Sequence, residues 1–323
     1  MRRTHLTGLV LGGWLLAAPA ALADTALQQT TCSFPAMLED LRAALKSGTP
    51  EFQRYMREFL KEAALAMPPG ELLAALEAER DPTVLEALGA ALATRASNTQ
   101  DAALLRPLLQ RAMKDSDPAL RAAAVRGLRG TGSVEFLEKH ADVATYGQLI
   151  RDPSPEVREA AADNVIHENQ KVYFGHYGPA ADAAVSMAAA APDPKLAAKL
   201  LSEVSMEQAG PEAVREVTRQ LGADSPALRQ AAAAALGGVP ASQATASRSA
   251  LLAQYRDERD PGVRKAILQA IAQLGQATAV PTLESLRGVD PAMGPEIDAW
   301  LRALKLPVQE WSLIQREKAR LLK

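Results

Sequence analysis

The chain has 323 residues, of which 48% are hydrophobic and 4% are aromatic, and its 36 basic and 38 acidic residues give a net charge of −2. Both signs of charge are mixed along the sequence, so the pattern shows no basic stripe of the kind that binds nucleic acid. The length exceeds the usual size of a single globular core, but a stack of repeats needs no single core.

The first 23 residues have the pattern of a signal peptide. A positive start, Met1–Arg3, comes before an apolar run at 6–18, and the small residues of Ala21–Ala23 form a cleavage site before Asp24. An uncleaved anchor is the alternative, although the run is shorter than the roughly 20 residues that span a bilayer. Cleavage predicts an exported chain, periplasmic or secreted, with a flexible start at 24–33 and no membrane span after the leader.

The next segment, 34–68, is predicted to be a helix pair that caps the N-terminal end of a larger structure. The single cysteine, Cys32, excludes an intramolecular disulfide and leaves a free thiol or an intermolecular disulfide as alternatives. The two helices are expected at Phe34–Leu45 and Phe52–Leu65. The second is expected to bury four side chains, namely Phe52, Tyr55, Phe59 and Leu60.

From residue 69 to residue 306, a helix-capping residue stands directly before a proline seven times. Asp or Ser at the N-cap accepts a hydrogen bond from a free amide of the first turn, and the proline after it needs no amide partner. Successive prolines are 36, 37, 39, 32, 35 and 30 residues apart, which is typical of stacked helical units. The anchors are Asp81-Pro82, Asp117-Pro118, Ser154-Pro155, Asp193-Pro194, Ser225-Pro226, Asp260-Pro261 and Asp290-Pro291.

Each anchor starts an amphipathic pattern. Apolar residues two and ten positions after the proline lie close to one helix face, as Val84 and Leu92 do. A second amphipathic stretch comes before most anchors, for example Leu104–Met113. No alternating strand pattern follows the leader, so the predicted fold class is all-α. In the last unit Pro295 disfavours an early start, and that helix is expected to begin near Pro295.

The segment Asp152–Ala161, with Asp-Pro-Ser-Pro-Glu-Val-Arg-Glu-Ala-Ala, resembles the second-helix signature of HEAT repeats, and the form recurs in three other units. The resemblance implies an α-α superhelix of about seven to eight helix pairs, in one domain at 34–323. Repeats fill 69–306, and a C-terminal helix at 307–323 caps the stack. Two units depart from the signature, with Leu85 and Ala197 in place of the arginine.

The signature arginines have two interpretations. In HEAT-like proteins, such arginines pair with aspartates to stitch a turn to its neighbour, and this structural interpretation is preferred over an open basic ladder. It implies pairing of Asp115 with Arg121 and of Asp152 with Arg158, six residues apart. Arg229 and Arg264 occupy the equivalent positions in later units.

The resemblance implies a non-catalytic scaffold for a protein or peptide partner, without a cofactor. The segment Glu168–Gly178 interrupts the repeat pattern and concentrates aromatic residues, so it is either a binding loop or a plug between units. Its candidate contact residues are Tyr173, Phe174, His176 and Tyr177. Further candidates on the second helices are Arg126, Glu159, Asn164, His167, Gln230, Lys265 and Gln269.

The alternative is an enzyme, or an enzyme subunit, with a metal or small-molecule site near 167–177, of the HEAT-like hydroxylase or lyase type. Hydroxylases that resemble deoxyhypusine hydroxylase bind two irons through repeated His-Glu pairs. This chain has one such pair, His167-Glu168, which is too few for that site. No catalytic residue and no metal ligand are therefore predicted. A structural spacer is a third interpretation.

Overall fold

The computed structural model describes residues 38–39, 42–43, 48–129, 144–173, 176–177 and 180–306, with the backbone alone at 144, 172–173 and 176–177. The predicted leader, the segment at 24–33, Cys32 and the C-terminal helix at 307–323 lie outside the described residues. Most of the first predicted capping helix lies outside them too.

Seven helix pairs follow one another in the described part, each with an A helix and a B helix. The A helices are α3 (Pro69–Ala78), α5 (Arg106–Lys114), α8 (Ala144–Leu149), α10 (Ala181–Ala190), α12 (Pro211–Gln220), α14 (Ala241–Asp257) and α16 (Val280–Val289). The B helices are α4 (Pro82–Thr99), α6 (Pro118–Gly127), α9 (Pro155–Asn169), α11 (Pro194–Glu203), α13 (Pro226–Leu236), α15 (Pro261–Gly275) and α17 (Gly294–Leu304). Short 3-10 turns are η1 (Ala102–Leu105), η2 (Gln276–Ala279) and η3 (Pro291–Met293).

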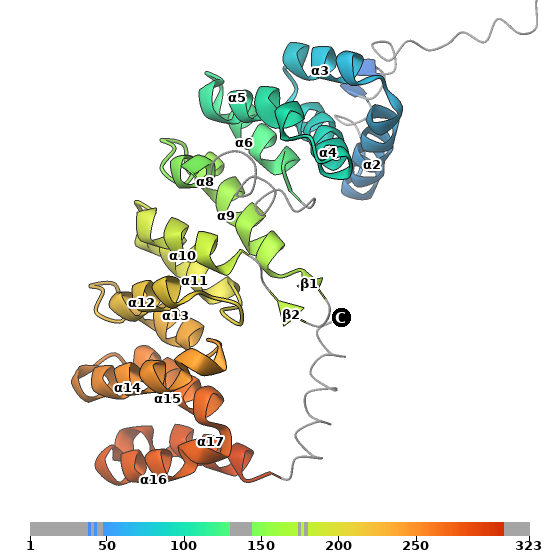
Figure 1. The fold of residues 1–323 in the computed structure, drawn as a ribbon. Helices are drawn as coiled ribbons and strands as arrows, with labels where there is room; N and C mark the ends of the chain where they lie inside the picture. The colour runs from blue at the N-terminus through green and yellow to red at the C-terminus, as the bar shows by residue number, and fades with distance from the viewer. Residues whose placement is uncertain are drawn as a thin grey trace, which may run out of the picture.

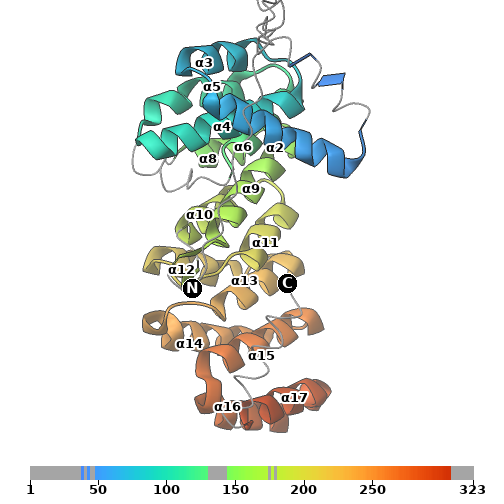
Figure 2. The same cartoon turned by 90° about the vertical axis from the view of Figure 1, so that its right-hand side faces the viewer.

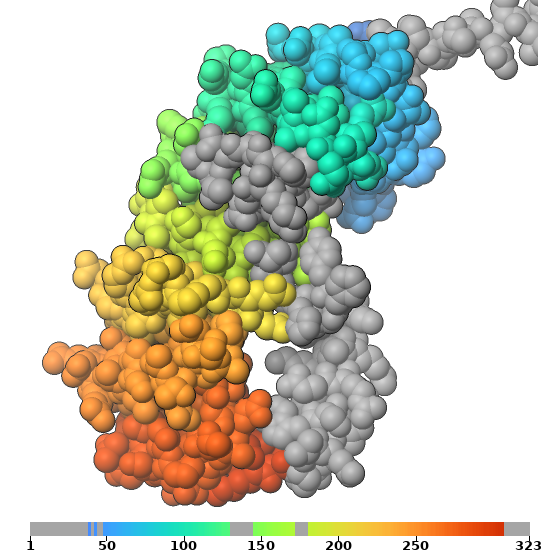
Figure 3. All heavy atoms as spheres, viewed as in Figure 1, coloured from blue at the N-terminus to red at the C-terminus, as the bar shows by residue number. Residues whose placement is uncertain are grey.

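The pairs stack into a curved solenoid with two layers (Figures 1 and 2). Each B helix packs against the next B helix from α4 to α17, and α2 (Pro50–Ala66) precedes them as a further B helix against α4. The A helices form the other layer, and the repeats follow one another as successive bands in Figure 3. The predicted all-α superhelix of about seven to eight pairs is confirmed.

Local capping explains where the B helices begin. The carboxylate of Asp81 accepts from the amides of Thr83 and Val84, and Asp117, Asp193, Ser225 and Asp260 cap their helices in the same way. Ser154 occupies the N-cap of α9, but its side chain makes no capping hydrogen bond. The last B helix starts at Gly294 with Pro295 in its first turn, as predicted.

The core lies between the two layers and runs through the stack. The apolar residues two and ten positions after each proline are buried from α4 to α15, as Val84 and Leu92 are in α4. Alanines between them, such as Ala123 and Ala124 in α6, are also buried and allow neighbouring helices to approach closely. Each repeat therefore buries its apolar face only because neighbouring repeats cover it.

The predicted core stripe of α2 is wrong at three of its four positions. Leu60 is fully buried, but Phe52, Tyr55 and Phe59 are 42%, 65% and 46% exposed. Leu60 and Ala64 face α4, whereas the three aromatic residues lie on another face of α2. No earlier B helix stands in the described part to cover that face.

A short hairpin corrects the expectation that no strand follows the leader. β1 (Val172–Tyr173) and β2 (His176–Tyr177) pair antiparallel, with Val172 opposite Tyr177 and Tyr173 opposite His176. In the sequence, Phe174 and Gly175 separate the strands, and a two-residue connection containing glycine favours a tight hairpin. The hairpin is too short to show the alternating pattern by which strands are recognised.

Helices α4 and α6 approach each other at two glycines. A Cβ atom added to Gly127 would lie 3.0 Å from Cα of Gly89 and 3.1 Å from the carbonyl oxygen of Glu86. Both obstacles are backbone atoms of α4, which cannot move without shifting the helix. The absence of a side chain at this position therefore sets the separation of the first two B helices.

We expect Gly127→Ala to lower the free energy of unfolding by about 1–3 kcal/mol, because the added methyl overpacks the contact. Urea unfolding followed by circular dichroism measures the change. Gly288→Ala is the matched control, since a Cβ atom there has no neighbour within 4 Å, and it should leave stability unchanged or raise it by about 0.5–1 kcal/mol. Equal destabilisation by both substitutions would contradict the packing argument.

Candidate functional site

Three of the four signature arginines, Arg121, Arg229 and Arg264, connect the turns of successive repeats. We call each arginine three positions after an anchor proline a ladder arginine, and the acidic residue at a following A-to-B turn a turn acid. Arg121 donates through Nε and Nη2 to the two carboxylate oxygens of Asp152 in the next repeat, at 3.0 and 2.9 Å. Arg229 makes the same bidentate contact with Glu258, at 2.8 and 2.9 Å.

Arg121, Arg158 and Arg229 also bind their own turns. Nη1 of Arg121 donates to the carbonyl oxygen of Asp115 at 2.8 Å, and Nη1 of Arg158 donates to that of Asp152 at 2.7 Å. The predicted six-residue pairs therefore join through backbone oxygens, and the carboxylate partner of Arg121 belongs to the next repeat. A planar guanidinium with five donors can hold both turns at once.

We call the contact between a ladder arginine and a turn acid a rung. The last rung of the described stack includes a third residue. Nη1 of Arg264 lies 3.2 Å from Asp290, and the hydroxyl of Tyr255 donates to the same carboxylate at 2.7 Å. The guanidinium also stands over the Tyr255 ring, 5.1 Å from its centre. Asp290, named above as the last anchor, thus serves as a turn acid instead of capping a helix with its side chain.

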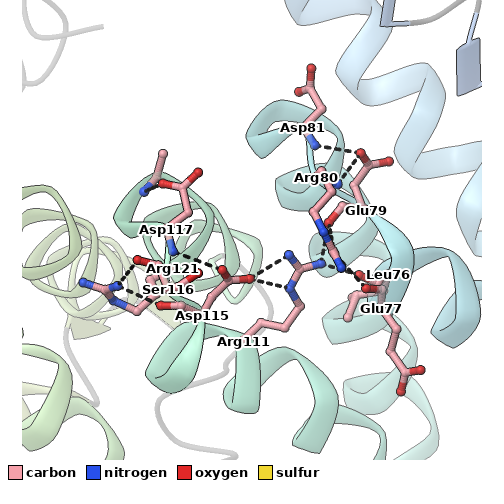
Figure 4. Close-up of polar contacts among 11 residues, drawn as sticks. Leu76, Glu77, Glu79, Arg80, Asp81, Arg111, Asp115, Ser116, Asp117 and Arg121 are labelled. Carbon is pink, nitrogen blue, oxygen red and sulfur yellow. Dashed lines mark hydrogen bonds and ion pairs between the residues drawn. The ribbon is translucent and has the colours of Figure 1, made fainter.

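We call the junction between two successive repeats a seam. At the seam between the α3–α4 repeat and the α5–α6 repeat, a different arginine replaces the missing ladder residue. Leu85 stands where an arginine would reach Asp115, and Arg111 of α5 binds Asp115 instead, at 2.8 and 3.2 Å (Figure 4). Nη1 of Arg111 also donates to the carbonyl oxygens of Leu76 and Glu79 in the preceding repeat, at 2.6 and 2.8 Å. The connection is kept although the signature position has changed.

These contacts stabilise the ionised form of the turn acids Glu258 and Asp152. Hydrogen bonds from Arg229 lower the pKa of Glu258 to about 2, against the opposing effect of burial. Burial raises the pKa of Asp152, but the hydrogen bonds from Arg121 and from the Ser154 amide outweigh it and hold that pKa below its usual value. These groups therefore connect neighbouring repeats.

The B layer carries a groove on the side away from the A layer. Side chains of α2, α4, α6 and α9 line it, and its volume is about 440 Å³. Thr94 and Ala90 of α4 lie along it, with Arg126 of α6 and His167 of α9. We call this side of the B layer the inner surface, defined by the residues four, eight and twelve positions after the anchor prolines.

Most of the candidate residues predicted on the second helices lie on the inner surface. Arg126, Glu159, Gln230, Lys265 and Gln269 occupy positions four or eight after a proline, and all but the half-buried Arg126 are exposed. They lie on successive B helices, so the structure places them along one face but not in one cluster. The same spacing selects Glu86 and Asp163, which the sequence analysis missed although this signal was available.

Asn164 is a correction. It lies nine positions after its proline, one step further round the helix, and it is 2% exposed. Its amide donates to the carbonyl oxygen of Val125 and to the Tyr146 hydroxyl. Asn164 therefore joins α9 to neighbouring helices and is not a contact residue for a partner.

Charges on the inner surface are paired across repeats. Nε of Arg126 lies 2.8 Å from Glu86 of α4. Nζ of Lys199 in α11 lies 2.8 Å from Glu159 and 2.7 Å from Asp163, both in α9. Arg126 and Lys199 thus contact carboxylates of a preceding helix, and the groove itself is lined by four Lys or Arg side chains and two Glu side chains.

The segment near 167–177 shows no metal centre in its described part. His167 is exposed at the edge of the groove, and partial desolvation, with Lys171 and Arg129 nearby, lowers its pKa. Among the described residues, no three His, Cys, Asp or Glu side chains come close enough to share a metal ion. The side chains of Tyr173, His176 and Tyr177, and the whole of Phe174, lie outside the described residues.

The repeat geometry agrees with a family match. Residues 217–304 match the sequence model of HEAT repeats. This segment of the chain therefore consists of HEAT repeats. The anchors and the helix pairs of this segment continue back to α3, so the repeats extend beyond the matched residues.

Other comparisons add similarities without a closer identification. No curated protein matches the sequence. YibA of E. coli has 14% identity, with 83% of this chain and 92% of that chain covered and a TM-score of 0.48. An engineered protein has 18% identity, with 83% and 78% covered and a TM-score of 0.43.

We expect Glu258→Gln to lower the free energy of unfolding by about 3 kcal/mol at pH 7, because the pKa of Glu258 falls from 4.5 to about 2 on folding. A lowered folded pKa stabilises above the unfolded value, so the difference from the parent should persist above about pH 5 and shrink as the pH falls toward 2. Urea unfolding at several pH values measures it. The exposed Glu62→Gln is the control, and a pH-independent difference for Glu258→Gln would refute the assignment.

Proposed function

We propose that this HEAT-repeat protein is an exported, non-catalytic scaffold that holds a protein or peptide partner on its inner surface. The groove across α2, α4, α6 and α9 is the observation that carries the proposal, because one open channel crosses four consecutive B helices. A channel of this kind suits a helix or an extended segment that runs along the stack. HEAT repeats commonly mediate protein interactions, which supports the same choice.

The chemistry of the inner surface also favours a macromolecular partner. Its charges are partly exposed ion pairs such as Arg126–Glu86, and pairs of this kind contribute little to stability. The charged groups of these pairs can therefore bind an incoming chain instead of each other at a small cost in free energy. Small and amide side chains at Ala234, Gln230 and Gln269 continue the surface over the later repeats, where a peptide backbone can approach closely.

Export is supported by the leader sequence. A positive start, an apolar run and the small residues of Ala21–Ala23 form a complete signal peptide pattern. Within the ranges that the structure describes, no helix is both long enough and apolar enough to cross a membrane. The proposed location of the mature scaffold is therefore the periplasm or the outside of the cell.

An arginine side chain introduced into the groove tests whether a partner binds there. Thr94 is half-buried on α4 and lines the groove, so Thr94→Arg should obstruct a partner and reduce its capture at least tenfold, or about 1.4 kcal/mol. Crosslinking capture of tagged residues 24–323 from an envelope extract, read by quantitative mass spectrometry, provides the measurement.

The control for that experiment is Gln148→Arg, which adds the same charge at an exposed site of the A layer on α8. It should leave capture unchanged, and both variants should keep the parent melting temperature. Equal capture by the two variants, or no enriched protein with the parent, would count against the proposed face.

Expression of the complete chain tests the leader. We expect the exported protein to begin at Asp24, since the cleavage site precedes that residue. Intact mass and N-terminal sequencing of a periplasmic fraction measure this. Replacing Ala21 and Ala23 by arginine should block processing, and a parent protein that keeps Met1 would refute cleavage.

A further inference from the structure

One seam of the solenoid lacks its rung. Arg158 occupies the ladder position of α9, but Ala191 stands where the next repeat would supply the turn acid. The guanidinium of Arg158 binds its own turn through Nη1, to the carbonyl oxygens of Asp152 and Pro153. Its Nε is buried and has no hydrogen-bond partner. Arg158 thus binds its own turn, but the next repeat supplies no carboxylate for it.

The backbone at Ala191 has the shape of a turn-acid position. It is the C-cap of α10 with φ −64° and ψ 132°. Asp115 has φ −60° and ψ 136°, and Glu258 has φ −73° and ψ 134°, each at the C-cap of its own A helix. The side chain is therefore the difference at this seam, and the turn itself is built to accept an acid.

The same seam has weaker packing. Helices α9 and α11 contact each other less extensively than α6 and α9 or α11 and α13 do. Polar contacts replace part of the missing apolar contact. Lys199 bridges to two carboxylates of α9, and the Asn169 side chain exchanges hydrogen bonds with the backbone of Ser205, at 3.0 and 2.7 Å.

The following seam shows that a missing rung alone does not loosen the stack. Ala197 and Ala223 occupy the ladder and turn-acid positions there, so neither partner of a rung is present. Helices α11 and α13 nevertheless pack closely along their length. The seam between α9 and α11 is distinguished by losing both the rung and the close packing.

We propose that the seam between the α8–α9 repeat and the α10–α11 repeat is a hinge, which lets the block α2–α9 swing against the block α10–α17. Within each block, rungs or close helix contacts hold the repeats together. At the hinge the Lys199 ion pairs are partly exposed and can lengthen and re-form at low cost, while the buried Asn169 side chain keeps its hydrogen bonds to Ser205. The unused face of Arg158 marks where one carboxylate would lock the joint.

Spin-label distance distributions test the hinge in the full mature chain, with Cys32→Ser so that only introduced cysteines react. Labels at Gln148 and Glu212 span the seam from α8 to α12, and labels at Glu212 and Ser285 span two repeats of the second block from α12 to α16. All three residues are exposed. We expect a broader distribution for the pair that spans the seam, and further broadening at high salt because salt screens the Lys199 pairs.

Ala191→Asp should supply the missing carboxylate to Arg158, narrow the seam distribution to the width of the second pair, and raise the melting temperature. Both effects should disappear in the double variant Arg158→Ala/Ala191→Asp. Ala223→Asp is the matched control, because Ala197 offers it no arginine, and it should change neither readout. Equal widths for the two label pairs in the parent, or a seam width that Ala191→Asp leaves unchanged, would overturn the proposal.

Discussion

The contact between a ladder arginine and two successive turns is the most directional interaction that joins neighbouring repeats. One end of the guanidinium binds the carbonyl oxygens of its own turn, and the other end binds a carboxylate of the next repeat, as Arg121 does between Asp115 and Asp152. Apolar packing alone is not directional, and it would allow repeats to slide or rotate. Where it is present, as at Arg121 and Arg229, the arginine gives the junction between repeats a definite register, and close helix packing holds α11 against α13.

The sequence was sufficient for the fold because the decisive signals are local. An N-cap residue and a proline start each B helix, and the apolar residues that follow belong to the same helix, so no long-range contact had to be inferred. The error at α2 has the opposite cause. Whether Phe52, Tyr55 and Phe59 are buried depends on a neighbour outside the helix, and amphipathic spacing cannot show which side of a terminal helix is covered.

The candidate site was only partly predictable for a related reason. Inner-surface positions follow from spacing, and Gln230 and Lys265 are exposed at such positions. Asn164 differs by a single step of helical phase, enough to turn it into the core. The partner of Arg121 lies 31 residues away in Asp152, and a repeat signature contains no information that favours the next turn over its own.

The paired charges of the inner surface affect the kinetics of any encounter there. Because Arg126 and Lys199 already have carboxylates beside them, each of these ion pairs projects little net field into the solvent. The pairs therefore attract an approaching chain only weakly from a distance, and association without electrostatic steering proceeds at about 10⁵–10⁶ M⁻¹s⁻¹. Selectivity among partners then resides in how long each remains bound, and the surface discriminates by residence time.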